Sequence, residues 1–155
     1  MSEKARVGIV LGSKSDEALL EPMTDVLDRL GVVWESRVAS AHRDPALVAD
    51  FAGSAEERGL RAIIAVAGLS AALPGVVAAH TLLPVIGVPV QGGALQGVDA
   101  LLSMAQMPRG VPVATVAIGK TGAVNAALLA GRILAVDDRE VRDRLLAIME
   151  EWKQS

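Results

Sequence analysis

The sequence RVGIVLGSKSD, residues 6–16, contains the clearest indication of the fold class. It begins with a run of apolar and β-branched residues and ends in a turn of glycine, serine and aspartate. Residues 17–30 then repeat apolar side chains at helical spacing, and Gly31 is a typical residue to end such a helix. A buried strand that leads directly into an amphipathic helix is typical of α/β proteins.

The same alternation of strand and helix continues to the C-terminus. Apolar runs predict strands at residues 6–11, 32–38, 62–67, 85–90 and 111–118. Helical periodicity predicts helices at residues 17–30, 45–58, 74–80, 95–107, 124–134 and 139–152. Strands that are nearly all hydrophobic indicate a parallel sheet covered on both faces. We therefore expect one domain over residues 1–155, an α/β three-layer flavodoxin-like doubly wound parallel sheet.

The composition indicates one small domain that associates with copies of itself. The chain has 155 residues, of which 52% are hydrophobic but only 2% aromatic, so the core is expected to consist of Ala, Val, Leu and Ile. The mean hydropathy of +0.42 is high for a soluble monomer of this size. We expect a homo-oligomer in which the C-terminal helix, residues 139–152, packs on another subunit. Pro89 predicts an edge or bulged position for strand 85–90.

Several classes of protein are disfavoured by the same composition. Glycines and prolines interrupt the most apolar stretch, residues 62–90, so no membrane helix fits there. The N-terminal residues show no signal-peptide cleavage pattern. A net charge of −3 without a basic block argues against nucleic-acid binding. With no cysteine and two histidines, the sequence offers no convincing metal-ligand set. We expect a cytoplasmic protein that binds neither membrane nor nucleic acid.

Ligands of open parallel sheets bind beyond the carboxyl ends of the strands, which draws attention to three loops. The first is residues 12–16, where Gly12, the hydroxyls of Ser13 and Ser15, and free N–H groups at a helix start favour a phosphate. Asp16 could accept hydrogen bonds from a ribose diol. The alternative is that Ser15 or Asp16 is simply the N-cap of the helix. There is no nucleotide-binding glycine motif of the ATP or NAD type.

The second loop carries the sharpest chemical signal, Ser40, Ala41, His42 and Arg43. Histidine titrates near neutrality, so His42 at a strand end can both take and give a proton. The guanidinium of Arg43 suits a phosphate or a carboxylate. The alternative is a polar loop in which His42 caps the next helix. The other histidine, His80, lies among alanines and is expected to have a packing or interface role.

A set of strings that spans nearly the whole chain resembles the bacterial 5-(carboxyamino)imidazole ribonucleotide mutase family. The strings occur in the family's order and spacing: GSKSD at 12–16, SAHR at 40–43, LPG at 73–75, PVIGVPV at 84–90, QMPRGVPVAT at 106–115 and NAALLA at 125–130. The resemblance implies a flavodoxin-like subunit assembled as an octamer, with no metal or organic cofactor. It also implies that a carboxylate moves from the exocyclic nitrogen of the substrate to carbon four of its ring.

The resemblance assigns roles to the residues of the first two loops. It implies that His42 shuttles a proton between the nitrogen and the carbon. It implies that Ser13, Asp16 and Arg43 hold the phosphate and ribose of the ribonucleotide. The reaction is coherent because the ring supplies its own enamine nucleophile, so the protein need only hold CO2, move one proton and exclude water.

The third loop departs from the family pattern. The mutases usually read GGAAHLPG where this chain reads GLSAALPG, residues 68–75, so a histidine is replaced by Ala72 and a glycine by Leu69. A sister class, which carboxylates aminoimidazole ribonucleotide directly, typically reads GRSN followed by a small residue and leucine. Ser70 and Ala72 fit that class, whereas Leu69 and Ala71 do not. The loop lines the carboxylate pocket of the family, and we include in the site Gly68, Leu69, Ser70, Ala71 and Leu73.

The sequence thus favours a mutase of purine biosynthesis that needs no cofactor. Direct carboxylation of aminoimidazole ribonucleotide with CO2 is the closest alternative, because of the third loop. A catalytically idle paralogue that binds a ribonucleotide is a further alternative, against which His42 and Arg43 count. A generic flavodoxin-like binding domain would need an aromatic residue to stack a flavin, and this chain has no tyrosine.

Overall fold

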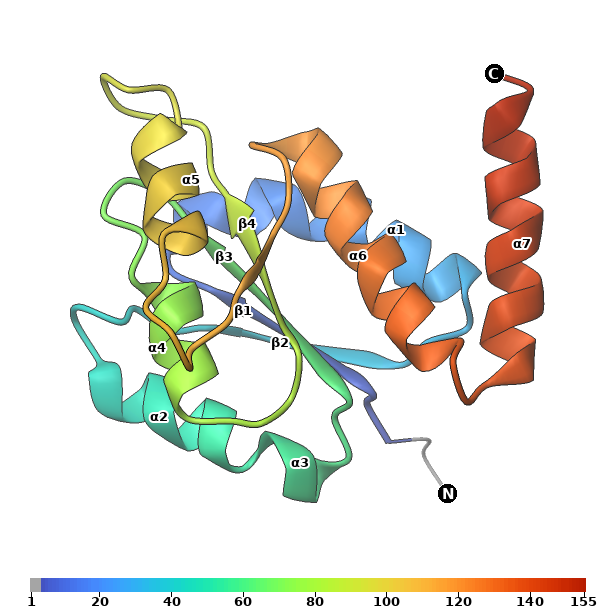
Figure 1. The fold of residues 1–155 in the computed structure, drawn as a ribbon, viewed down its shortest axis with the longest axis horizontal. Coiled ribbons are helices and arrows are strands. Elements are labelled where there is room, and N and C mark those ends of the chain that lie inside the picture. The colour runs from blue at the N-terminus through green and yellow to red at the C-terminus, as the bar shows by residue number, and fades with distance from the viewer. Residues whose placement is uncertain (1–3) are drawn as a thin grey trace.

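A single parallel sheet organises the computed structural model, which describes residues 4–155 (Figure 1). The strand order is β2-β1-β3-β4-β5, the doubly wound order of flavodoxin-like proteins. The elements, in chain order, are β1 (Val7–Leu11), the 3-10 helix η1 (Lys14–Leu19), α1 (Leu20–Arg29), β2 (Trp34–Val38), α2 (Pro45–Gly53), α3 (Ala55–Arg58), β3 (Ala62–Ala67), α4 (Leu73–Ala79), β4 (Val85–Pro89), α5 (Val98–Ala105), β5 (Ala114–Thr115), α6 (Lys120–Leu134) and α7 (Arg139–Lys153). The predicted fold class is confirmed.

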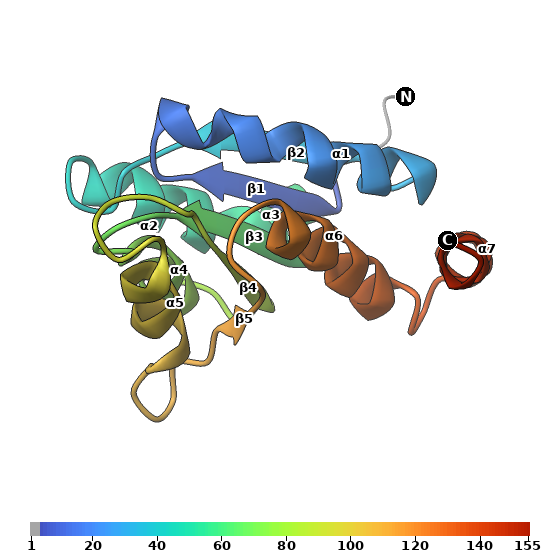
Figure 2. The ribbon, with the colours of Figure 1, turned by 90° about the horizontal axis from the view of Figure 1, so that it is seen from above.

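The sheet separates two apolar layers, because successive side chains of a strand point to opposite faces. On β1, Ile9 packs with the layer of α1, α6 and α7, and Val10 packs with the layer of α2, α3, α4 and α5. Figure 2 shows these two sets of helices on either side of the strands. Every residue of β1, β3 and β4 is buried, as predicted for a parallel sheet covered twice.

The edges of the sheet differ from the sequence prediction. The predicted strand 111–118 is wrong in extent, because only Ala114 and Thr115 pair with β4. Pro112 lacks an N–H group for the ladder, and most of this segment is only partly covered. β4 is not an edge strand, since β5 pairs with Ile86 and Gly87. Pro89 nevertheless lies beyond that short pairing, where its missing N–H group breaks no ladder hydrogen bond.

The predicted helix 45–58 is two helices. The chain leaves α2 at Ser54, whose N–H and hydroxyl both donate to the carbonyl of Asp50, at 3.0 and 2.7 Å. α3 then runs for four residues and ends at Gly59, which has φ of 101°. Of the remaining helices, α5 is shorter than predicted and α6 begins four residues earlier, at Lys120 instead of 124. None of the helices in the described part of the chain is long and apolar enough to cross a membrane.

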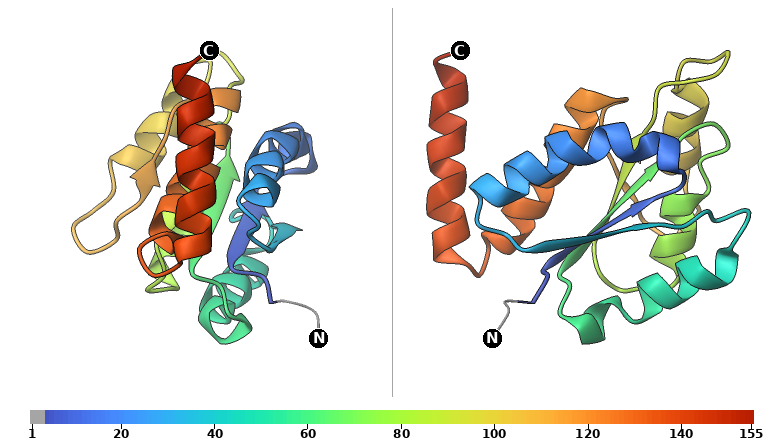
Figure 3. Two further views of the ribbon diagram at one scale, coloured as in Figure 1. Left: turned by 90° about the vertical axis from the view of Figure 1, so that its right-hand side faces the viewer. Right: turned by 180° about the vertical axis from the view of Figure 1, so that it is seen from behind.

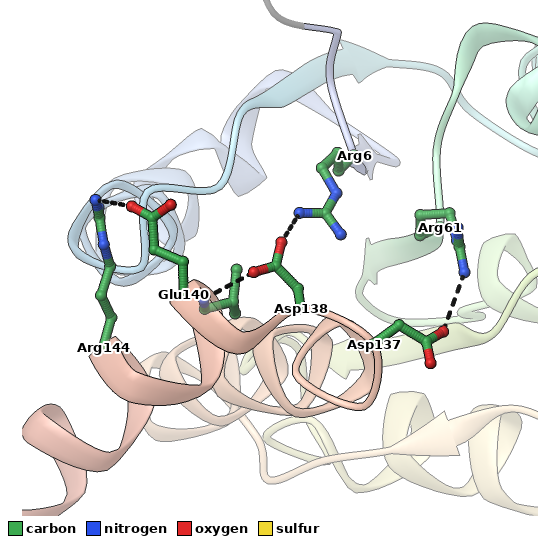
Figure 4. Close-up of polar contacts among 7 residues, drawn as sticks. Arg6, Arg61, Asp137, Asp138, Glu140 and Arg144 are labelled. Atoms are coloured by element: carbon green, nitrogen blue, oxygen red, sulfur yellow. Dashed lines mark hydrogen bonds and ion pairs between the residues drawn. The ribbon is translucent and has the colours of Figure 1, made fainter.

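The C-terminal helix α7 packs on α6, at the side of the molecule away from α2 and α4 (Figure 3). Asp138 is its N-cap and accepts a hydrogen bond from the backbone N–H of Val141 at 3.1 Å. The same carboxylate accepts a hydrogen bond from Arg6 at 2.5 Å, which ties α7 to the segment before β1 (Figure 4). Asp138 therefore both caps the last helix and joins it to the start of the sheet. Packing of this helix on another subunit stays a prediction.

Candidate active site

One pocket of about 420 Å³ lies at the carboxyl ends of the strands and contains every residue that the sequence predicts for the site. Four loops line it, one after each of β1, β2, β3 and β4. Its lining residues are Gly12, Ser13, Ser15, Asp16, Ser40, Ala41, His42, Arg43, Ala67, Gly68, Leu69, Ser70, Ala71, Ala72, Leu73, Val90, Gln91, Gly92 and Gly93. The strand order explains the convergence, since β2, β1, β3 and β4 are consecutive neighbours.

The first loop presents hydroxyl groups at the start of η1. Ser13 is the N-cap, and its Oγ accepts hydrogen bonds from the backbone N–H of Ser15 at 3.3 Å and from the Ser15 hydroxyl at 2.9 Å. The alternative in which Ser15 or Asp16 is the cap is therefore wrong. Gly12 continues the sheet by donating its N–H to the carbonyl of Val66 at 2.9 Å. Both serines are exposed and line the pocket, so their hydroxyls can reach a ligand.

Asp16 is the one carboxylate in the lining of the pocket, and it is buried at 7% exposure. Burial raises the pKa of Asp16, and a backbone hydrogen bond from Ser13 opposes this rise in part. None of the ion pairs within residues 4–155 involves Asp16. A buried carboxylate without a cationic partner can accept further hydrogen bonds, which suits it to hydroxyl groups of a ligand.

The second loop holds His42 and Arg43 on a turn that other residues fix. The Ser40 carbonyl accepts a hydrogen bond from the N–H of Asp44 at 2.9 Å, and the Ser40 hydroxyl accepts one from the N–H of Arg43 at 3.2 Å. Asp44 caps α2 by accepting from the N–H of Leu47 at 3.1 Å, so the alternative in which His42 is the cap is wrong. Both side chains are exposed, and neither has a side-chain hydrogen bond or ion pair to the described residues.

The third loop is tightly turned and leads into α4. The N–H of Ala71 donates to the carbonyl of Leu69 at 2.8 Å, and the N–H of Ala72 donates to that of Ser70 at 2.8 Å. Ala71 and Leu73 are buried, whereas Leu69 and Ser70 are exposed. Leu69 has φ of 51°, a left-handed conformation that favours glycine. The backbone thus keeps the shape of a glycine position although the residue is leucine.

A fourth loop, Val90 to Gly93, lines the pocket and was not among the three predicted loops. Its signal was present in the sequence, because Gln91-Gly92-Gly93 directly follows a predicted strand. The rule that selected the other loops applies here once β4 is known to adjoin β3. The Gln96 side chain donates to the carbonyl of Gly93 at 2.9 Å and accepts from the Gln91 side chain at 3.2 Å, which fixes the loop.

The second histidine is remote from this pocket. His80 follows the last residue of α4 and lines a different hollow with Glu56 and Leu82. Its Nδ1 lies 2.8 Å from the carbonyl oxygen of Val76. The side chain is exposed, so a packing role within the subunit is wrong, whereas an interface role stays a prediction. Among residues 4–155, no three or more histidine, aspartate or glutamate side chains cluster as metal ligands would.

Comparison with known proteins gives one consistent result. The AIR carboxylase family model matches residues 6–155. The N5-carboxyaminoimidazole ribonucleotide mutase of Escherichia coli strain K12 is 54% identical over 151 residues, which is 97% of this chain and 87% of that protein. The mutase of the same name from Bacillus subtilis strain 168 is 53% identical over 149 residues, 96% of this chain and 92% of that protein. The crystal structure of Treponema denticola PurE superposes with a TM-score of 0.86 at 31% identity, over 97% of this chain and 93% of that one.

Proposed function

The chain belongs to the AIR carboxylase family, and from this we propose that it is an N5-carboxyaminoimidazole ribonucleotide mutase of purine biosynthesis. It converts N5-carboxyaminoimidazole ribonucleotide to 4-carboxy-5-aminoimidazole ribonucleotide. The observation that carries this proposal is the identity of more than half to curated mutases over nearly the full chain. The pocket supports it, because His42 and Arg43 line the same space as Ser13 and Asp16.

We propose that the first two loops bind the ribonucleotide part of the substrate. The hydroxyls of Ser13 and Ser15 and the guanidinium of Arg43 are donors suited to phosphate oxygens. Gly12 and Ala41 add little bulk, so the backbone can approach the ligand. Asp16 is the acceptor for the ribose hydroxyls, which would add hydrogen bonds to its buried carboxylate.

The base would then lie over His42 and the third loop. The protonated imidazole of His42 gives its proton to the exocyclic nitrogen as the carbamate C–N bond breaks and CO2 leaves. Carbon four of the ring, an enamine carbon, then attacks CO2 and forms the new C–C bond. The neutral imidazole takes the proton that carbon four loses, so atoms, charge and the enzyme are restored. The ring is itself the nucleophile, and the proposed reaction therefore needs no metal or organic cofactor.

We propose that the enzyme is a homo-oligomer, with the octameric assembly that the family resemblance implies. Large apolar side chains support association, since Leu82 is 96% exposed and Val136 and Leu146 are also largely uncovered in the subunit. Light scattering of the purified protein tests this point, and a monomer in dilute solution would contradict it. The cytoplasm remains the expected location.

Direct carboxylation of aminoimidazole ribonucleotide with CO2 is the second candidate, favoured by Ser70 and Ala72 of the third loop. The deciding experiment offers purified protein the carboxyamino substrate in one assay, and aminoimidazole ribonucleotide with CO2 or bicarbonate in another. We expect product absorbance to rise with the first substrate. Turnover only of the second at low CO2 would favour the carboxylase instead. Binding of the ribonucleotide without turnover of either would identify an idle paralogue.

A further inference from the structure

The side chain of Gln91 lies on the fourth loop of the pocket, directly after β4. Its Nε2 donates to Oε1 of Gln96 at 3.2 Å, and Nε2 of Gln96 donates to the carbonyl of Gly93 at 2.9 Å. Gln91 is exposed and lines the pocket, whereas Gln96 lies outside the pocket lining. Gln91 is therefore the member of this short chain of amides that a ligand in the pocket can reach.

These two hydrogen bonds fix which end of each amide faces which partner. The carbonyl of Gly93 can only accept, so Gln96 must turn its NH2 group toward it. Gln96 then presents its oxygen to Gln91, which must direct its own NH2 group toward that oxygen. Among residues 4–155 the Gln91 side chain makes this one hydrogen bond, so its Oε1 remains as an acceptor for a ligand.

The backbone around this amide is held by close contacts. Gln96 has φ of 52°, a left-handed conformation that only Leu69 shares among the described residues other than glycine. A Cβ on Gly97 would stand 3.2 Å from Cα of Gln91 and 3.0 Å from the carbonyl oxygen of Val90, so the residue after Gln96 packs directly on the Gln91 backbone. Strained backbone of this kind persists where surrounding contacts hold it, and it gathers at ligand-binding sites. Both the position and the orientation of the Gln91 amide are thus fixed.

Gln91 and His42 lie on opposite sides of the pocket. His42 follows β2 and Gln91 follows β4, and β1 and β3 lie between these two strands in the sheet. The contacts proposed above hold the phosphate and the ribose, which leaves the imidazole ring free to rotate about its glycosidic bond. Half a turn exchanges the ring edge that carries the exocyclic nitrogen with the edge that carries only C–H. A hydrogen-bond acceptor distinguishes these edges, because N–H is a much stronger donor than C–H.

We propose that Gln91 selects the orientation of the ring by accepting a hydrogen bond from the exocyclic N–H of the substrate, and that Gln96 is a positioning residue that orients the Gln91 amide. This inference rests on the proposed function. The N–H bond lies in the plane of the ring, whereas the nitrogen lone pair that His42 protonates is perpendicular to that plane. The two side chains can therefore approach the same nitrogen from different directions. Because this nitrogen carries a hydrogen before and after the carboxylate moves, the contact can hold the ring in one orientation throughout the reaction.

A pair of ligands tests the contact. Calorimetric titration compares the product, 4-carboxy-5-aminoimidazole ribonucleotide, with 4-carboxyimidazole ribonucleotide, which lacks the amino group. The ratio of the two affinities isolates the contribution of the amino group. Gln91→Met keeps the length of the side chain but removes the acceptor, and we expect this ratio to fall roughly fivefold from its wild-type value, as for the loss of one hydrogen bond.

Two further variants separate recognition from folding. Gln96→Gly accepts φ of 52° without strain and removes the positioning amide. Its affinity ratio should fall by a smaller factor, while its affinity for the ligand without the amino group stays close to that of wild type. Gln154→Met makes the matched change at the exposed C-cap of α7 and should leave both affinities unchanged.

The outcomes distinguish this inference from the function on which it rests. If the wild type turns over the carboxyamino substrate and Gln91→Met keeps the wild-type affinity ratio, the inference is wrong and the mutase function stands. A wild-type ratio in Gln96→Gly would remove Gln96 from the positioning role. If the wild type does not turn over that substrate, the proposed function is wrong and the inference fails with it.

Discussion

Gly122 lies against the carbonyl of Ala117 so closely that a Cβ on this glycine would stand 1.6 Å from the carbonyl oxygen. This contact fixes the first turn of α6 on the segment that precedes it. Gly119, between the two residues, donates its N–H to the carbonyl of Pro89 at 2.9 Å and so ties the same segment to the end of β4. Gly122 is required because the Ala117 carbonyl, which cannot rotate away, occupies the space that a side chain at position 122 would need.

Gly122→Ala is expected to destabilise the protein strongly. The new methyl group meets fixed backbone, and we expect the free energy of unfolding to fall by about 3 kcal/mol. Gly131→Ala on the same helix is the matched control, because its Cβ would meet only the end of the flexible Leu30 side chain, at 2.5 Å. That change should cost about 1 kcal/mol or less, since alanine also favours the helix. Urea denaturation of both variants measures the difference, and equal losses would contradict the assignment.

Asp16→Asn is expected to make the free protein more stable at neutral pH while weakening ribonucleotide binding. Burial raises the pKa of Asp16 above its ordinary value of 3.8, so the charged carboxylate costs the folded state free energy. That cost is absent below pH 3.8 and grows as pH rises through the raised pKa. The stability gain of the variant should therefore appear at neutral pH and vanish toward pH 3. Denaturation at a series of pH values, with titration of the ribonucleotide at pH 7, checks both effects.

Asp138→Ala should show the opposite pH dependence. Hydrogen bonds from the Val141 N–H and from Arg6 hold the pKa of Asp138 below its ordinary value of 3.8. The charged carboxylate thus stabilises the folded state above pH 3.8, and this stabilisation is lost as pH falls through the lowered pKa. We expect the variant to be less stable than wild type at pH 7, with a difference that shrinks in acid. A difference independent of pH would show that the charge of Asp138 contributes nothing.

His42→Asn is expected to abolish turnover of the carboxyamino substrate while affinity for the product ribonucleotide stays close to wild type. Asparagine keeps a polar side chain of similar size but cannot transfer a proton at neutral pH. His80→Asn is the matched control, because His80 lies outside the pocket. Steady-state assays and ligand titration compare the two variants. Turnover by His42→Asn at the wild-type rate would remove the imidazole from the proposed proton transfer.

The strain at Leu69 predicts an unusual order of stability. Leu69→Ala removes the contact with Gly93 but keeps a Cβ at φ of 51°, whereas Leu69→Gly removes the contact and the strain together. We expect the glycine variant to be more stable than the alanine variant by about 1 kcal/mol. Thermal and chemical denaturation of the pair measure this. An alanine variant that is the more stable of the two would show that the backbone is not strained.

The sequence predicted the central strands and the last helix well, and the edge strand and the division of one helix poorly. The strand at 62–67 has the predicted bounds, because six buried apolar residues leave no other interpretation. The helix at 45–58 divides at Ser54, and the apolar periodicity of the segment does not reveal where one helix ends and the next begins. The strand at 111–118 shrinks to two residues, because edge pairing depends on neighbours that a single segment does not specify.

Three loops of the candidate site were predicted from a geometric rule, and the same rule also covers the fourth loop, which the prediction left out. Loops after neighbouring parallel strands must meet, so the residues of three loops share one pocket. The loop at Val90–Gly93 was omitted because its residues carry no titratable group, although the rule includes it. The left-handed backbone at Leu69 could not be predicted, since leucine is a residue that seldom adopts it.

Both margins of the sheet are poor templates for another strand. β5 offers only Ala114 and Thr115, and β2 carries Glu35, Ser36 and Arg37 on the opposite margin, with Glu35 paired to Arg58 at 2.9 Å. Charges and brevity at sheet margins discourage strand addition between molecules. We therefore expect copies of this subunit to associate through their helices and connecting segments. We also expect the folded protein to resist the cross-β stacking that leads to fibres.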